Sequence, residues 1–247
     1  MHRAAFYVFL AAARLSAQGR GGAPSAQAAA PFDLTGYWVS VVTEDWRYRM
    51  MTPAKGDYPS IPLTPEGRKI ADAWDPAKDQ ADGNQCKGYG AGNIMRMPGR
   101  LHVTWQDANT LKIETDTGMQ MRLFHFGRPQ VPQSPNTAAD WQGFSVAQWE
   151  FAGGGRGRGE PQGGDLKVVT TRMRPGYLQK NGVPYSGDAV FTEHFDLLGR
   201  EANGDQWLIV TTLVDDPQYL TRSFQRSTHF KRQPDASGWD PSPCTAN

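Results

Sequence analysis

Hydrophobic and polar positions alternate along most of the chain, and this pattern predicts β-strands, because successive strand side chains point to opposite faces. Turn-forming residues separate most of these segments. Strands are expected to begin near Gly36, Arg100, Thr110, Met119, Gly143, Leu166, Ala189, Gln206 and Ser223. We predict an all-β fold in which an antiparallel meander of about eight to ten strands closes into a barrel, since closure removes exposed sheet edges.

One segment has the pattern of a short helix instead. Thr64 can cap its first turn, Pro65 suits the first helical position, and Glu66 complements the helix dipole. The Asp75-Pro76 pair is expected to end it. The prediction is therefore one helix over residues 64–74.

Two tight turns predict which side chains share a face of the sheet. If residues 107–109 and 116–118 are three-residue hairpin loops, the odd-numbered residues of three consecutive strands form one apolar face that ends at His125. His102 then lies opposite Glu114 on the polar face, as a solvated cross-strand pair. The two histidines point to opposite sides of the sheet, so we do not expect them to bind a metal together.

A carboxylate and two arginines fall on otherwise apolar faces. Glu193 lies between Phe191 and Phe195, and an uncompensated buried carboxylate needs a partner or a raised pKa. Arg226 lies on the apolar face of the last strand, within bridging reach of Glu193 across one intervening strand. Arg172 shares a face with Leu166, Val168 and Thr170, and both faces of that strand are partly apolar.

These positions allow two interpretations. In the functional one, Glu193 is a general acid or base and His125 is its complementary proton carrier. The residues expected to bind the substrate are Arg226 or Arg172, as the anchor for an anion, with Trp38 and Trp105 as walls. In the structural one, Glu193 and an arginine form an ion pair inside the barrel, and His125 lies at a solvated strand end.

Another short segment carries a weaker signal. Residues 46–49 read Trp-Arg-Tyr-Arg and alternate aromatic and basic groups, which suits an anionic ligand. A strand with a stacked surface explains the same pattern, so both interpretations stay open.

Charge and composition exclude two broad classes. The chain of 247 residues has 26 Lys and Arg against 25 Asp and Glu, so it lacks the basic surplus of a dedicated nucleic-acid-binding protein. No apolar run reaches the roughly 18 residues that a membrane-spanning helix needs. Eight Trp and eight Tyr supply bulky side chains for a core that is short of aliphatic residues.

The N-terminus and the cysteines indicate export. Residues 1–17 resemble a secretory signal, residues 18–31 are expected to be a flexible linker, and residues 32–247 a single barrel domain. Cys86 and Cys244 are expected to form a disulfide in an oxidising periplasmic or extracellular compartment. Two isolated cysteines do not have the spacing of a zinc site, and no metal or other cofactor is expected.

The segment Gly36-Tyr37-Trp38 resembles the Gly-x-Trp signature of the lipocalin (calycin) family, in which the Trp closes one end of an eight-stranded barrel. The chain is also similar to a large group of uncharacterised exported bacterial proteins. The matching segments are 62–67, 73–76, 141–145 with 149–150, 182–186 with Glu193 and Phe195, and 215–217. The resemblance implies a secreted barrel and no particular activity. A long insertion over residues 52–99 departs from lipocalins.

Together these features predict a secreted barrel enzyme that performs metal-free acid–base chemistry on a small, partly apolar molecule. Elimination, isomerisation or hydration would place it among the lyases or isomerases. The alternative is a non-catalytic carrier of a small hydrophobic ligand in the barrel, and a third reading is an envelope protein whose solid barrel works through its surface. The expected partner is a small molecule rather than a nucleic acid.

Overall fold

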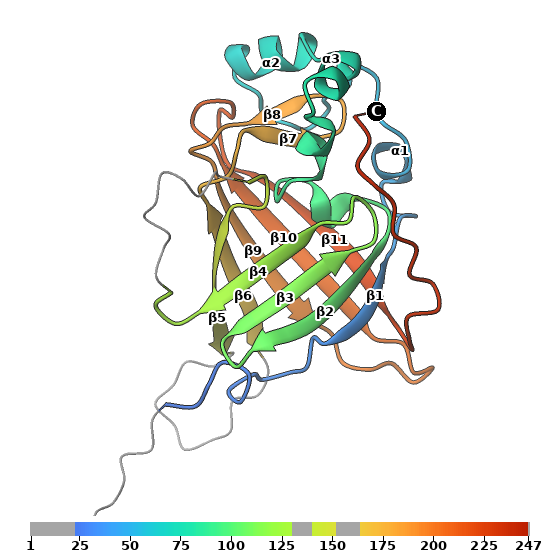
Figure 1. Cartoon of the computed structure of the whole chain (residues 1–247), viewed down its shortest axis with the longest axis vertical. Helices are drawn as coiled ribbons and strands as arrows, with labels where there is room; N and C mark the ends of the chain where they lie inside the picture. The colour runs from blue at the N-terminus through green and yellow to red at the C-terminus, as the bar shows by residue number, and fades with distance from the viewer. Residues whose placement is uncertain (1–22, 130–139, 152–163, 247) are drawn as a thin grey trace, which may run out of the picture.

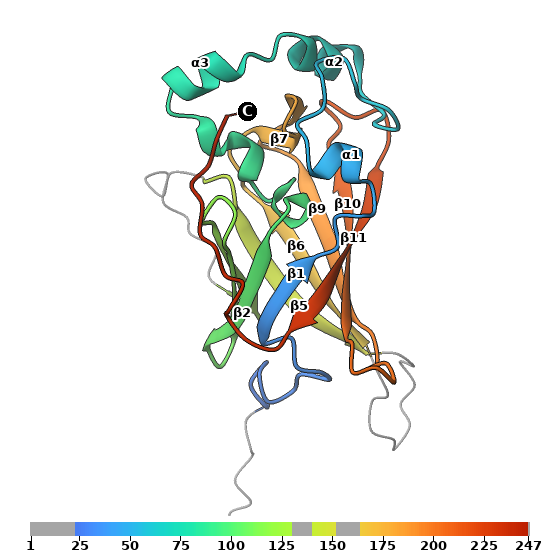
Figure 2. The same ribbon diagram turned by 90° about the vertical axis from the view of Figure 1, so that its right-hand side faces the viewer.

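A closed barrel of nine strands forms the body of the protein (Figures 1 and 2). The computed structural model describes residues 23–129, 140–151 and 164–246. The barrel strands are β1 (Gly36–Ser40), β2 (Arg100–Asp107), β3 (Thr110–Thr115), β4 (Met121–Phe126), β5 (Phe144–Phe151), β6 (Gly164–Thr171), β9 (Val190–Leu197), β10 (Trp207–Asp215) and β11 (Phe224–Gln233). Each begins at or close to a predicted position, so the expected all-β barrel is confirmed.

One pair of neighbouring strands departs from the predicted antiparallel meander. β4 and β5 run parallel, whereas the other neighbours in the ring run antiparallel. Strand directions cannot alternate all the way round a closed ring with an odd number of strands, so one neighbouring pair must be parallel. The connection over residues 127–143 is long enough to return the chain to the end of the barrel from which β4 starts.

The N-terminal segment lies at the end of the barrel shown lowest in Figure 1, which we call the linker end. The predicted signal at residues 1–17 and the beginning of the predicted linker, residues 18–22, lie outside the described residues. Within residues 23–31, the Ala26 carbonyl accepts a hydrogen bond of 2.9 Å from the Trp149 indole. Phe32 then packs edge-on against Trp149, with ring centroids 5.3 Å apart.

The opposite end, which we call the capped end, is covered by the long insertion and by a small hairpin (Figures 1 and 2). The elements outside the barrel are α1 (Trp46–Arg49), α2 (Pro65–Asp72), α3 (Pro76–Ala81), the 3-10 turns η1 (Gln85–Tyr89) and η2 (Ile94–Arg96), and the hairpin strands β7 (Gly176–Gln179) and β8 (Val183–Tyr185). Helix α2 confirms the predicted helix, and the Thr64 hydroxyl accepts a hydrogen bond from the Gly67 amide as expected. The hairpin and the shorter helices were not predicted.

The Asp75-Pro76 pair does more than end α2. The Asp75 carboxylate accepts hydrogen bonds from the amides of Ala77 and Lys78, at 3.0 and 3.3 Å. Pro76 occupies the first turn of α3, where its missing amide hydrogen costs nothing. A pair that stops one helix therefore caps the next one.

Side chains from every barrel strand fill the interior. The main core cluster comprises Leu34, Trp38, Tyr89, Ile94, Met95, Met97, Leu101, Val103, Leu111, Ile113, Phe124, Ala147, Leu166, Val168, Phe195, Leu208, Val210 and Phe230. Ile94 and Met95 join it from the η2 turn, so the insertion contributes to the barrel core as well as covering its end. A second cluster, which includes Tyr185 and Phe191, lies where the hairpin and the α2 region meet the barrel.

The two predicted hairpins have different outcomes. His102 pairs with Glu114 across β2 and β3, with Nδ1 and Oε2 3.4 Å apart, which confirms the expected cross-strand pair. In the next hairpin Glu114 pairs with Met121 rather than with residue 120, so the predicted three-residue turn is wrong. The longer turn shifts β4 by one residue and brings its even-numbered residues to the inner face.

The disulfide between Cys86 and Cys244 is present, with the Cα atoms 5.0 Å apart. It attaches the C-terminal tail to the η1 turn. The tail also pairs with the turn between β3 and β4, where the Gly118 amide donates to the Ser242 carbonyl at 2.8 Å. Among the described residues, no helix is long and apolar enough to cross a membrane.

Candidate functional site

Glu193 lies on the inner face of β9, as predicted, and its side chain is fully buried. Its partner is Arg122 of β4, an even-numbered residue that the predicted register puts on the polar face with His102 and Glu114. The guanidinium holds both carboxylate oxygens, with Nη1 3.0 Å from Oε1 and Nη2 2.5 Å from Oε2. The one-residue shift of β4 puts Arg122 inside, so the buried carboxylate gains an opposite charge.

Two hydroxyl groups extend this pair into a buried network. Arg122 Nη2 donates to the Thr170 hydroxyl at 3.1 Å, and that hydroxyl lies 2.7 Å from the Ser145 hydroxyl. Thr170 and Ser145 are themselves buried. A bidentate carboxylate surrounded by core side chains has the geometry of a structural ion pair, which was the alternative reading of Glu193.

His125 lies on the other side of the barrel wall from Glu193. Its neighbours in β4, Phe124 and Phe126, pack into the core, so His125 points outward and stacks on Phe144 with ring centroids 5.1 Å apart. Its predicted place on the inner face is wrong, for the same reason that Arg122 was misplaced. Burial against Phe144 lowers the pKa of His125, and attraction to Asp107 partly opposes this. The structure does not bring the expected proton carriers together.

The residues expected to bind the substrate are spread over the molecule. Arg172 follows the end of β6 in a left-handed conformation and is exposed, so its predicted place on the inner face is wrong. Trp38 is fully buried in the barrel core, and its indole donates to the Leu34 carbonyl at 2.9 Å. Trp105 packs against Phe126, with ring centroids 5.6 Å apart. These three residues do not share a site.

Arg226 is on the inner face of β11, in register with Thr212 and Glu193, as predicted. It does not bridge to Glu193. Its guanidinium turns toward the capped end and donates to the carbonyls of Leu178, at 2.8 Å, and of Gly92. There it lines a hollow at the mouth of the barrel.

Two adjoining hollows at this mouth form what we call the arginine cleft. They share Tyr48 and Arg96, and their volumes are about 300 and 290 Å³. The first is lined by residues 48–52, Tyr89, Asn93, residues 96–98, Thr117 and Lys180, and the second by Asp45, Tyr48, residues 59–61, Arg96, Gln179 and residues 224–226. Segments that are remote in the sequence therefore meet in one cleft.

Arg49 is a buried cation of the arginine cleft, with 7% of its surface exposed. Its Nε donates to the Arg96 carbonyl at 3.1 Å, and its Nη1 donates to the Val41 carbonyl at 2.5 Å. The buried Nη2 has no hydrogen-bond partner among the described residues. A buried donor without an acceptor costs about 1–3 kcal/mol, so Arg49 has an unsatisfied hydrogen-bonding group while it lines the first hollow.

The arginines of the cleft outnumber their ion-pair partners among the described residues, while the carboxylates of Glu44 and Glu193 act on Arg49 and Arg226 without an ion pair. Arg96 forms an ion pair with Asp45, which is the one carboxylate, within the described part of the chain, that pairs with an arginine of the cleft. Burial, and then repulsion by Arg96, lower the pKa of Arg49 to about 10, so it stays charged at neutral pH. Burial and repulsion by Arg96 also lower the pKa of Arg226. Three arginines that repel one another favour an anion between them.

Two left-handed residues and two exposed methionines also line this cleft. Asp45 and Ser60, which line the second hollow, have φ values of 60° and 66°, a left-handed conformation that non-glycine residues seldom adopt. Met50 and Met51 are more than half exposed beside the first hollow. The cleft thus combines guanidinium groups with apolar contacts, as a binding site for a small organic anion requires.

A larger hollow, of about 610 Å³, lies at the linker end between the β9–β10 hairpin and the end of β11. Its charged groups are already partnered: Lys231 forms an ion pair of 2.8 Å with Asp205. Arg232 donates to the carbonyls of Asp33 and Thr35 and stacks over Trp38. We therefore place the candidate site at the arginine cleft rather than at the larger hollow.

The sequence held one signal for this cleft. The Trp-Arg-Tyr-Arg segment that suited an anionic ligand forms helix α1, not a strand, and contributes Tyr48 and Arg49. Arg96 had no such signal, because the long insertion showed no regular pattern around it. Comparisons with protein families, with curated proteins and with solved structures found no match to this chain.

Proposed function

We propose that this protein binds a small, partly apolar organic anion, such as a carboxylate or a phosphate, in the arginine cleft. The observation that carries the proposal is the convergence of Arg49, Arg96 and Arg226 on adjoining hollows, with a buried donor of Arg49 left without a partner. The proposal keeps the expected role of Arg226 as an anion anchor and moves the ligand from the barrel interior to its mouth.

Catalysis by Glu193 is not part of this proposal. A general acid or base must reach its substrate directly or through one water molecule. The Glu193 carboxylate has no exposed surface, and Arg122 holds both of its oxygens. A binding or carrier protein is therefore the function that these contacts support best.

The proposal includes export to the periplasm or to the outside of the cell. The disulfide between Cys86 and Cys244 is compatible with an oxidising compartment. The signal-like pattern of residues 1–17 supports the same compartment.

Two fluorescent probes test the proposed ligand class on the full chain. Anilinonaphthalene sulfonate is an apolar anion, and N-phenylnaphthylamine is its uncharged counterpart. We expect one sulfonate per chain, and the uncharged probe to bind at least about tenfold more weakly. Arg49→Gln and Arg226→Gln should each weaken sulfonate binding by about ten- to hundredfold, as expected for the loss of a charge-assisted hydrogen bond.

Arg200→Gln is the matched control. Arg200 is an exposed arginine at the linker end, where it donates to the Gly204 carbonyl, so its replacement should leave the sulfonate affinity unchanged. Near-UV circular dichroism would verify that each variant is folded. Equal sulfonate affinity in the wild type, Arg49→Gln and Arg226→Gln would refute the proposal.

A further inference from the structure

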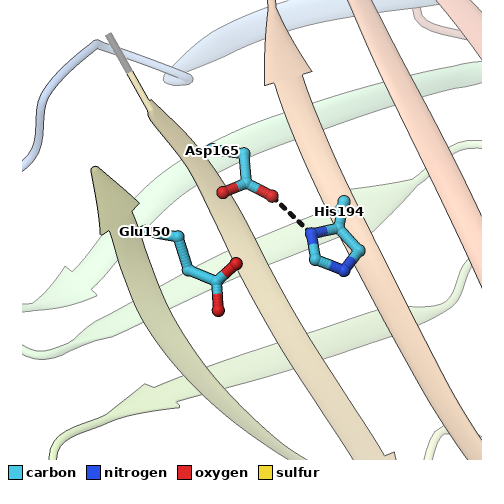
Figure 3. Close-up of side chains that lie close together, drawn as sticks. All are labelled: Glu150, Asp165 and His194. Carbon is cyan, nitrogen blue, oxygen red and sulfur yellow. Dashed lines mark hydrogen bonds and ion pairs between the residues drawn. The ribbon is translucent and has the colours of Figure 1, made fainter. Parts of the chain in front are cut away.

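Three potential metal ligands converge on the outer wall of the barrel, away from the arginine cleft. Figure 3 shows Glu150 of β5, Asp165 of β6 and His194 of β9, whose side chains point toward one another from three neighbouring strands. One donor atom from each lies within 4.8 Å of the others. All three residues are half-buried, so an ion could reach them from solvent.

The strand register explains why these side chains meet. Glu150 pairs directly with Asp165 across β5 and β6. His194 pairs with Lys167, two residues along from Asp165 on the same face of β6. Because paired strands hold their side chains at fixed spacing, little conformational entropy would be lost on binding an ion.

The hydrogen bonds of the cluster leave donor atoms unused. Asp165 Oδ2 contacts His194 Nδ1, the contact drawn as a dashed line in Figure 3. Gln148 and Lys167 both contact Oε1 of Glu150, at 2.8 and 3.2 Å, so these contacts do not use Oε2. Each carboxylate therefore has an oxygen that could turn to a cation.

The local charge also favours a cation. Asp196 lies two residues along β9 from His194, on the same outer face. Among the described residues, three carboxylates therefore lie on the same outer face as this imidazole, and Lys167 is the one lysine that forms an ion pair with the cluster, through Glu150.

We propose that Glu150, Asp165 and His194 bind a divalent transition-metal ion, with water completing the coordination. One imidazole nitrogen and two carboxylate oxygens form a ligand set that suits Zn²⁺, and three protein ligands leave a position open to solvent. The imidazole selects against Ca²⁺ and Mg²⁺, which prefer oxygen ligands alone. This site departs from the metal-free protein that the sequence predicts, and it is independent of the arginine cleft.

Zinc binding to the full chain tests the site. After dialysis against a chelator, calorimetric titration with ZnCl₂ should show saturable uptake of one ion per chain, and CaCl₂ should bind at least about tenfold more weakly. His194→Ala and Asp165→Asn should each weaken Zn²⁺ binding by at least about tenfold. Lys167→Ala should tighten it, because the lysine no longer competes for Glu150.

His102→Ala is the matched control. His102 is also a half-exposed outer-face histidine beside a glutamate and a lysine, Glu114 and Lys112, but among the described residues it belongs to no cluster that contains two carboxylates. Its replacement should leave the Zn²⁺ affinity unchanged. If His194→Ala or Asp165→Asn does not fold, Glu150→Gln replaces the most exposed of the three ligands and should weaken Zn²⁺ binding in the same way.

Three results would overturn the proposal: no saturable Zn²⁺ uptake by the wild type, equal loss in His194→Ala and His102→Ala, or Ca²⁺ binding as tight as Zn²⁺ binding. Because the arginine cleft is not involved, sulfonate binding should be the same with and without Zn²⁺. A failure of the zinc site would therefore leave the proposed anion site untouched.

Discussion

At the scale of single residues, the Arg122–Glu193 pair shows how an inner barrel face accommodates charge. A single charged group would be strongly unfavourable in the core. Together the two side chains form two hydrogen bonds, and both are fully buried. The pair is enclosed by packed side chains, whereas the arginines at the mouth border open hollows. This difference in surroundings separates a structural charge from the charges to which we assign the proposed anion.

Removing one partner of the buried pair should destabilise the fold. Glu193→Gln leaves the Arg122 charge without a counterion, and we expect the free energy of unfolding in urea to fall by about 3–5 kcal/mol. Replacing both groups, with Arg122→Met and Glu193→Leu, should cost less than Glu193→Gln alone. A Glu193→Gln protein as stable as the wild type would contradict the structural role.

At the scale of elements, the turn between β3 and β4 decides which face of β4 is buried. Gly118 has a φ of 77° in this turn, and a Cβ atom there would lie 2.3 Å from Cδ1 of Tyr89. Met119 also adopts a left-handed conformation, with a φ of 50°. These two residues lengthen the loop beyond the three-residue form, and the resulting shift puts Arg122 inside and His125 outside.

Gly118→Ala should therefore be markedly more harmful than the same change at a similar glycine in open space. Gly127 is the matched control, because it has a φ of 82° and a Cβ atom added there would meet nothing within 4 Å. We expect Gly127→Ala to cost about 1 kcal/mol for the backbone conformation, and Gly118→Ala to cost a further 1–3 kcal/mol, roughly, for overpacking against Tyr89. Urea unfolding measures both. Equal losses at the two positions would show that Tyr89 does not constrain the turn.

At the scale of the whole molecule, the disulfide connects the insertion to the end of the chain. Cys86 and Cys244 are separated by 158 positions in the sequence, so the bridge closes most of the described domain into one loop. The cap, the tail and the β3–β4 turn are held against one another by this link and by the pairing of Ser242 with the turn. The cleft at the mouth depends on the same cap, since η2 and its neighbours line it.

Removing the disulfide should lower the stability of the whole domain. For a loop of this length the chain-entropy model gives a loss of about 5 kcal/mol for the Cys86→Ser and Cys244→Ser double variant. Urea unfolding without reductant measures the loss, and reductant should bring the wild type to the same curve. The expectation fails if the double variant unfolds at the same urea concentration as the oxidised wild type.

The sequence by itself determined the features that depend on local patterns. Period-two alternation located the barrel strands, including the inner-face positions of Glu193 and Arg226, because pleating makes side-chain direction a property of each strand alone. The Thr64 cap identified α2 for a similar reason. The cysteine pairing could be inferred because two cysteines allow a single bridge.

Only the tertiary structure decided what depends on how separate segments meet. The conformation of one turn decided the register of β4. The resulting shift of one residue put Arg122 on the inner face, where His125 was expected. The arginine cleft joins α1, η2 and β11, and the outer-wall cluster joins β5, β6 and β9. Local sequence patterns carry no information about such long-range contacts, since these form only when the barrel closes and the insertion packs against its mouth.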